Sequence, residues 1–149
     1  MATLRDRPYV QFNFLVDFGE GTEGPAAGFQ ELSGIGMEVT VSEYRTGNSK
    51  ENSVMKITGM NKSSDVTMKR GVIGSLNLYK WLDEIRNGDQ NAMRTVTVTL
   101  MSEDHSQPVM TWKLMRARPI KVVDGPLSAK GTDVAIEEMV LAYERLEME

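Results

Sequence analysis

The chain has 149 residues, no cysteine and a formal net charge of −4. This length suits a single domain, residues 1–149, with one substantial core, and the absence of cysteine excludes disulfides and thiolate metal ligands. The slight acidic excess argues against a basic nucleic-acid-binding surface, and neither a secretory signal nor an apolar run of about 20 residues is visible. We therefore expect no sequence-specific nucleic-acid partner and no membrane anchor.

The N-terminal part of the chain predicts strands separated by glycine-rich connections. Apolar and polar side chains alternate over residues 10–18, which is typical of a half-buried strand. A glycine-rich loop follows at 19–28. The next strand is expected over residues 29–45, with a bend or bulge at 33–36, where two glycines occur.

The segment 46–53 contains no apolar side chain. We therefore predict an exposed, mobile connection here. Two short strands are expected after it, at 54–57 and 65–70.

One helix is predicted after these strands. Its apolar stripe, at helical spacing, consists of Leu78, Trp81, Leu82 and Ile85. Ser75 is the expected N-cap, and Asn87 with Gly88 is the expected end.

The C-terminal part predicts a hairpin and one ambiguous segment. Threonine alternates with valine and leucine over residues 94–100, and a second strand is expected at 109–115 after a polar turn. Pro119 should interrupt or border the strand that follows. Residues 133–146 fit a helix and a strand about equally well on local pattern alone.

These elements predict a mainly β fold, with about seven strands forming a sandwich or barrel on which the helix packs. The eleven methionines are unusual for this length. Most lie on or near predicted strands, where they would fill the core. The alternative is adaptable packing at a repeated subunit interface.

No motif predicts chemistry. Residues 19–24 match G-x-G-x-x-G, but no helix follows, and Glu20 and Glu23 would repel a phosphate. His105 is the only histidine, so a catalytic triad or a histidine-based metal site lacks partners. The neighbouring acidic pairs, such as Glu103 with Asp104, are typical of solvated surfaces. We predict no catalytic, cofactor-binding or metal-binding residue, no cofactor and no enzymatic activity.

Several segments, in order along the chain, share a pattern with one known family. They are residues 9–16, 29–35, 41–47, 66–71, 78–81, 108–112, 116–121 and 133–137. They resemble the phage tail tube proteins, in the branch shared by contractile phage tails and extracellular contractile injection systems. Met68 stands where that family usually has leucine, and the acidic glycine loop at 19–24 departs from its pattern.

The resemblance implies two antiparallel β-sheets packed as a barrel-like sandwich with one flanking α-helix, and it assigns residues 133–146 to a strand. It implies homo-hexameric rings that stack into a hollow inner tube, in which neighbouring subunits cover each other's sheet edges. The implied partners are a sheath protein, baseplate and tape-measure proteins, and a cargo of effector protein or DNA in the lumen. Assembly in the bacterial cytoplasm is expected, within a phage tail or an extracellular injection particle.

The resemblance also implies that the polar segment reaches neighbouring subunits and becomes ordered only on assembly. The expected inter-subunit contacts are Tyr44, Arg45, Thr46, Gly47, Asn48, Ser49, Lys50, Glu51, Asn52, Ser53, Lys69 and Arg70. Two alternatives stay open. One is a tube-initiator or baseplate paralogue of the same fold, which often carries an adaptor segment that is not visible here. The other is a monomeric β-barrel that binds a small molecule.

Overall fold

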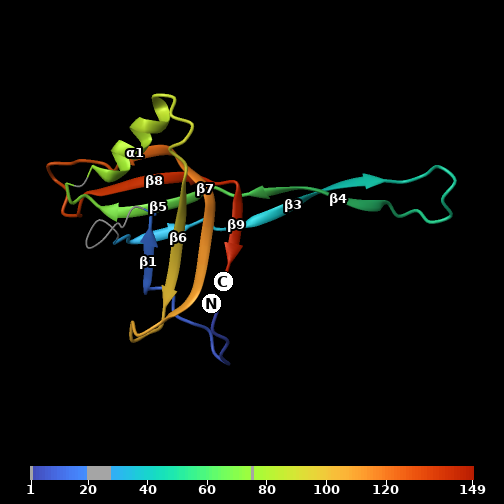
Figure 1. The fold of residues 1–149 in the computed structure, drawn as a ribbon, viewed down its shortest axis with the longest axis horizontal. Coiled ribbons are helices and arrows are strands. Elements are labelled where there is room, and N and C mark those ends of the chain that lie inside the picture. Colours follow the sequence, from blue (N-terminus) through green and yellow to red (C-terminus); the bar gives the residue numbers. More distant parts are fainter. Residues whose placement is uncertain (1, 20–27, 75) are drawn as a thin grey trace.

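The computed structural model describes residues 2–19, 28–74 and 76–149. Within these ranges the chain forms nine strands and one helix (Figure 1). The elements are β1 (Phe14–Asp17), β2 (Glu31–Ser33), β3 (Met37–Tyr44), β4 (Met55–Ser63), β5 (Val66–Gly71), α1 (Asn77–Arg86), β6 (Arg94–Met101), β7 (Pro108–Asp124), β8 (Ile136–Ala142) and β9 (Arg145–Met148).

Two antiparallel sheets form the body of the molecule, and β7 belongs to both. Its first part pairs with β6 and β9, and β1 pairs with the other side of β6. Its second part pairs with β8, and the sheet continues through β5 to β2. Close to the junction of the two parts, Arg116 is a non-glycine residue with a φ of 51°. The strands of the two sheets run in clearly different directions (Figure 1), which a strand that bends from one sheet into the other makes possible.

Pro119 lies inside β7 and does not end it. The pairing with β8 shifts register between Pro119 and Lys121. In the described part of the chain, this half of β7 has β8 as its only strand neighbour. A proline is tolerated at such an edge or bulge, because a missing amide hydrogen costs no ladder bond there.

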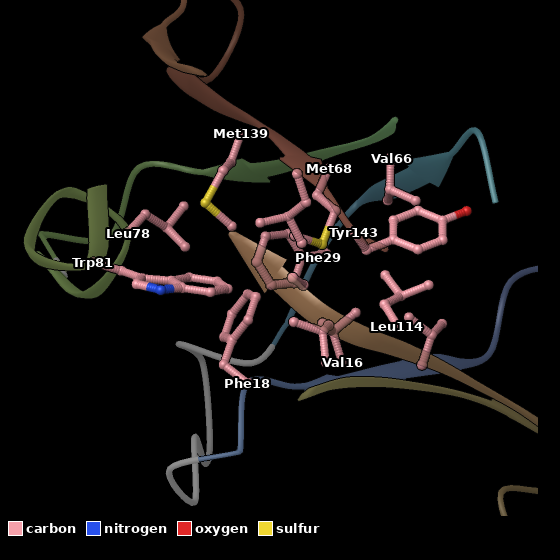
Figure 2. Packing of buried hydrophobic residues seen from close by; sticks show 14 of the residues in the cluster. Val16, Phe18, Phe29, Val66, Met68, Leu78, Trp81, Leu114, Met139 and Tyr143 are labelled. Carbon is pink, nitrogen blue, oxygen red and sulfur yellow. The ribbon is translucent and has the colours of Figure 1, made fainter. Parts of the chain in front are cut away.

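The core lies between the two sheets and beneath the helix (Figure 2). Val96 and Leu114 of one sheet, and Met68 and Leu141 of the other, are completely buried. At the helix end of the core, the rings of Phe18 and Trp81 meet edge to face, with centroids 5.6 Å apart, a favourable aromatic geometry. The Trp81 indole also donates a hydrogen bond of 2.7 Å to the Ala92 carbonyl.

The structure confirms the mainly β sandwich with one flanking helix and corrects several boundaries. The first strand begins at Phe14 and not at residue 10, because the chain bends at 11–12 and the buried Asn13 side chain bonds to the turn after β6. The segment 133–146 contains no helix but two strands, β8 and β9. The helix begins at Asn77, and the expected cap Ser75 lies outside the described residues, as does most of the 19–28 loop.

Candidate assembly surface

A long hairpin, here called the arm (residues 37–63), projects from the body (Figure 1). Its strands β3 and β4 pair with each other and form a separate two-stranded sheet. The pairing shifts register between Val39 and Val41, where β4 contains one extra residue. The observed β4 is much longer than the predicted strand at 54–57.

Both faces of the arm carry apolar side chains that nothing in the described chain covers. Residues two apart on a strand point to the same face, and paired residues share a face. By this rule Met37, Val39 and Val41 lie on one face. Tyr44, Met55 and Ile57 lie on the other. Each of these six side chains is at least half exposed.

Such an arm is unusual as a free element. An isolated two-stranded hairpin is marginally stable in water, and contiguous exposed apolar surface marks interaction sites. Of these six residues, the predicted contacts included only Tyr44, and the valines and Ile57 were not expected at an interface. Their alternation was visible in the sequence, but alternation alone does not tell a covered strand from an uncovered one.

The predicted contact segment, residues 44–53, forms the tip of the arm. It is exposed, as expected, and it is held by its own hydrogen bonds. The Arg45 guanidinium donates to the Glu51 carbonyl at 3.0 Å and to the Ser49 carbonyl at 3.2 Å. The Ser49 amide donates to the Thr46 carbonyl at 3.1 Å. The tip therefore has a defined turn geometry within one subunit.

Lys69 and Arg70, the remaining predicted contacts, lie on opposite faces of β5. Lys69 faces outward and lies 4.0 Å from the Glu31 carboxylate. Arg70 points into the body, where it is 1% exposed and forms an ion pair with Glu137. The Asn77 side chain accepts a further hydrogen bond from it at 2.6 Å. The charge of Arg70 is neutralised inside the subunit and its side chain is not exposed, so its predicted inter-subunit contact has no support from the burial and stays a prediction.

The arm joins the body through a compact set of hydrogen bonds around Gly36. The Tyr143 hydroxyl donates to the Gly36 carbonyl at 2.8 Å and accepts from the Gly36 amide at 3.1 Å. On the other strand, the Ser64 amide donates to the same carbonyl at 3.2 Å, and its hydroxyl donates to the Gly34 carbonyl at 2.6 Å. The local sequence patterns gave no sign of the Tyr143 contact, which spans 107 positions.

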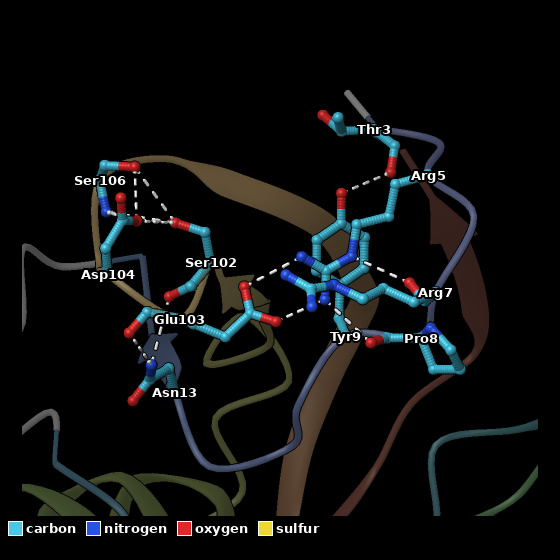
Figure 3. A network of polar contacts seen from close by, with 10 residues as sticks. All are labelled: Thr3, Arg5, Arg7, Pro8, Tyr9, Asn13, Ser102, Glu103, Asp104 and Ser106. Atoms are coloured by element: carbon cyan, nitrogen blue, oxygen red, sulfur yellow. Dashed lines mark hydrogen bonds and ion pairs between the residues drawn. The ribbon is translucent and has the colours of Figure 1, made fainter.

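The N-terminal segment, residues 2–13, lies against the turn between β6 and β7 (Figure 3). The Arg5 guanidinium pairs with the Glu103 carboxylate through both of its oxygens and lies 3.7 Å from the centroid of the Tyr9 ring. The hydrogen bond from Arg5 lowers the pKa of Glu103 to about 2. Hydrogen bonds from the Ser102 and Ser106 hydroxyls lower the pKa of Asp104 to about 2. Both carboxylates therefore stay ionised at mildly acidic pH.

The remaining polar residues that were considered for chemistry lie in a turn or form ion pairs within the subunit. His105 sits in the turn with a φ of 61°. Basic residues of β7 form ion pairs with Glu144 and Glu149. Across the described ranges, no cluster of three or more histidine and acidic side chains could hold a metal ion, and no described helix is long and apolar enough to cross a membrane.

The methionines lie in two different environments, and the predicted packing at a subunit interface stays a prediction. Met68 and Met139 are fully buried in the core, whereas Met37, Met55 and Met60 are exposed on the arm. Flexible thioether side chains suit both environments, since they adapt to irregular neighbours.

A two-sheet sandwich with one packed helix and a long hairpin arm is the fold of the tail tube proteins. The chain belongs to the family described as the T4-like virus tail tube protein gp19, whose model matches residues 10–147. No relative was found among curated protein sequences.

Solved structures support the same assignment. A chain of the anti-feeding prophage baseplate, 6-fold symmetrised, is 26% identical with a TM-score of 0.82, and the match covers 97% of each chain. A chain of the PVC sheath-tube complex, an extracellular contractile injection system in the extended state, is 25% identical with a TM-score of 0.82, covering 95% of this chain and 91% of that one. Hcp1 from Flavobacterium johnsoniae shares the fold at 10% identity and a TM-score of 0.55, covering 92% and 94%.

Proposed function

We propose that this chain is the inner-tube subunit of a phage-tail-like contractile injection system. It acts by self-assembly and not by catalysis, as one domain of residues 1–149. Subunits close into hexameric rings, and the rings stack into a hollow tube that is driven forward when a surrounding sheath contracts. The observation that carries the proposal is the arm, whose two apolar faces have no covering layer in the described part of the subunit.

The arm supplies the driving force for subunit contacts. Burying one exposed side chain of the valine, isoleucine or methionine type contributes about 1.5–3 kcal/mol when burial is complete. The arm carries eight exposed side chains of this kind, counting Tyr44, and a ring repeats each contact. The tip residues 44–53 and the outward-facing Lys69 add polar contacts that set the register between subunits.

The proposed partners follow from the family and from its relatives. The matched structures are described as a sheath-tube complex and a baseplate, and a third is a tube-terminating cap. We therefore propose a sheath protein around the tube, baseplate and tape-measure proteins that start it and limit its length, and a cargo of effector protein or DNA in the lumen. Assembly would take place in the bacterial cytoplasm, before release within a phage or injection particle.

One alternative has a specific observation in its favour. A matched structure is a baseplate, so the chain could form a single initiating ring instead of the main tube. The two functions differ in one visible outcome, because an initiator ring stops after one layer, whereas a main tube subunit adds further rings.

Electron microscopy of the purified chain over a range of concentrations tests the proposal. Stacked rings or hollow tubes are expected, whereas single rings that never stack would support the initiator. The matched variant Val41→Asp/Ile57→Asp places one charge on each face of the arm and should stay monomeric and folded. Monodisperse wild-type particles at every concentration, with a melting temperature that rises with an added small molecule, would instead support a monomeric binding protein.

A further inference from the structure

The chain passes between the body and the arm twice, at residues 34–36 and at residues 63–65. Hydrogen bonds join these two segments. The Ser64 amide and hydroxyl donate to carbonyls of Gly36 and Gly34. Gly34 has a φ of +93°, and a Cβ atom there would lie 2.3 Å from the Asp65 carbonyl oxygen. The two segments therefore form one tightly packed unit, which has no room for a side chain at Gly34.

Tyr143 connects this unit to the body. Its ring belongs to the core cluster and is 7% exposed, and its hydroxyl points out of the cluster (Figure 2). That hydroxyl donates to the carbonyl and accepts from the amide of the same residue, Gly36. With one donated and one accepted hydrogen bond, the Tyr143 hydroxyl uses its main hydrogen-bonding capacity. Because the ring is packed in the core, the position of the hydroxyl is fixed.

Because the arm is long, a small rotation at its base moves its tip by a large distance, so the contact between Tyr143 and Gly36 matters. The nine residues of β4 extend about 30 Å at about 3.3 Å per residue. A rotation of about 10° at the base would therefore displace the tip by about 5 Å. Subunit contacts need their side chains held far more closely than that, and an arm that is already oriented loses less entropy on binding.

We infer that Tyr143 is the positioning residue of the arm: its bidentate contact with Gly36 fixes the direction of the arm before a neighbouring subunit arrives. The arm would then be pre-oriented, in contrast to the expectation that the segment orders only on assembly. The consequence for tube formation rests on the proposed function, whereas the direction of the arm in the monomer does not.

The absence of cysteine allows a clean distance measurement. Two cysteines would be introduced at exposed sites, Lys56→Cys on the arm and Lys80→Cys on the helix, and labelled with nitroxides. Pulsed electron spin resonance, at a concentration where light scattering shows monomers, then reports the spread of arm-to-body distances. Tyr143→Phe removes the hydroxyl and keeps the ring, and Tyr79→Phe removes an exposed hydroxyl on the helix as the matched control.

We expect a narrow distance distribution in the parent and in Tyr79→Phe, and a distribution at least twofold broader in Tyr143→Phe with only a small change in melting temperature. The concentration needed for rings or tubes should rise at least tenfold in Tyr143→Phe alone. An unchanged distribution in folded Tyr143→Phe overturns the inference, and a broader one with unchanged assembly overturns its consequence for tube formation. If the parent never assembles, the proposed function fails, while the distance measurement still decides whether Tyr143 orients the arm.

Discussion

Strands of the body and of the arm share the same alternation of apolar and polar residues, but their apolar side chains lie in opposite environments. In β6 of the body, Val96 and Val98 are buried beneath the second sheet, while the threonines that alternate with them face outward. In β3 of the arm, Val39 and Val41 alternate with polar residues in the same way, yet each is half exposed. The body buries its apolar faces within one subunit, whereas the arm needs another molecule to do so. Changes in the body should therefore affect folding, and changes in the arm should affect assembly.

The largest effect on folding is expected at Trp81. Trp81→Ala would leave a cavity where the helix packs on Phe18 and would remove the hydrogen bond to the Ala92 carbonyl. We expect a loss of about 3–5 kcal/mol in the free energy of unfolding, measured by urea denaturation of unassembled protein. Tyr79→Ala, an exposed position on the same helix, should change it by less than about 0.5 kcal/mol. Equal losses in both variants would contradict the assignment of Trp81 to the core.

A loss of similar size, about 3 kcal/mol or more, is expected at Arg70. Arg70→Ala leaves the buried Glu137 carboxylate without its cation, and breaking one side of a buried ion pair is strongly destabilising. The double variant Arg70→Met/Glu137→Leu removes both charges and should recover most of the loss. Calorimetric melting of the three proteins measures this. A single variant as stable as the parent would contradict a stabilising role for the buried ion pair.

The boundary between the two regions should show an intermediate effect at Gly34. Gly34→Ala puts a side chain at a φ of +93° and a Cβ against the Asp65 carbonyl. We expect a cost of about 2 kcal/mol from the left-handed backbone and the crowding, measured by urea denaturation, together with impaired assembly. Gly47→Ala at the arm tip is the matched control, since a Cβ there meets nothing within 4 Å. If both substitutions cost the same, the joint is not tightly packed.

Local sequence patterns predicted elements well and contacts between distant elements poorly. The alternation over residues 94–100 and the stripe from Leu78 to Ile85 gave β6 and α1 nearly as observed, because both depend on neighbours in the chain. The segment 133–146 stayed ambiguous locally because its pairing with β5 and β7 decides it. Alternation along β5 places Arg70 on the same face as the buried Val66 and Met68, whereas its partner Glu137 comes from the pairing of β5 with β8, which no local pattern records.

The same limit applies to the candidate site. The polar tip was predictable from its composition, whereas the exposure of Val41 and Ile57 depends on the absence of a covering layer. The contacts of Tyr143 with Gly36 and of Arg5 with Glu103 join residues 107 and 98 positions apart. Such contacts are consequences of the fold, so they become visible only once the strands are placed.

The smallest effect is expected at the N-terminal segment, where a partly exposed ion pair acts locally and not on global stability. The folded-state pKa of Glu103 is lowered from its ordinary value of 4.5 to about 2. The contribution of the ionised Glu103 to holding the segment is therefore fully present above about pH 4.5 and is lost as the pH falls toward 2.

The protection factor of the Thr3 amide, which donates to the Val109 carbonyl, should fall over this range, as measured by hydrogen exchange corrected for intrinsic rates. Glu103→Gln should show low protection already at neutral pH with a weaker pH dependence, because the carboxylate that pairs with Arg5 is gone. Glu147→Gln, which alters an exposed ion pair on β9, should leave Thr3 unchanged. Protection in Glu103→Gln equal to that of the parent would mean that backbone bonds alone hold the segment, and acid would then release it only when the body itself unfolds.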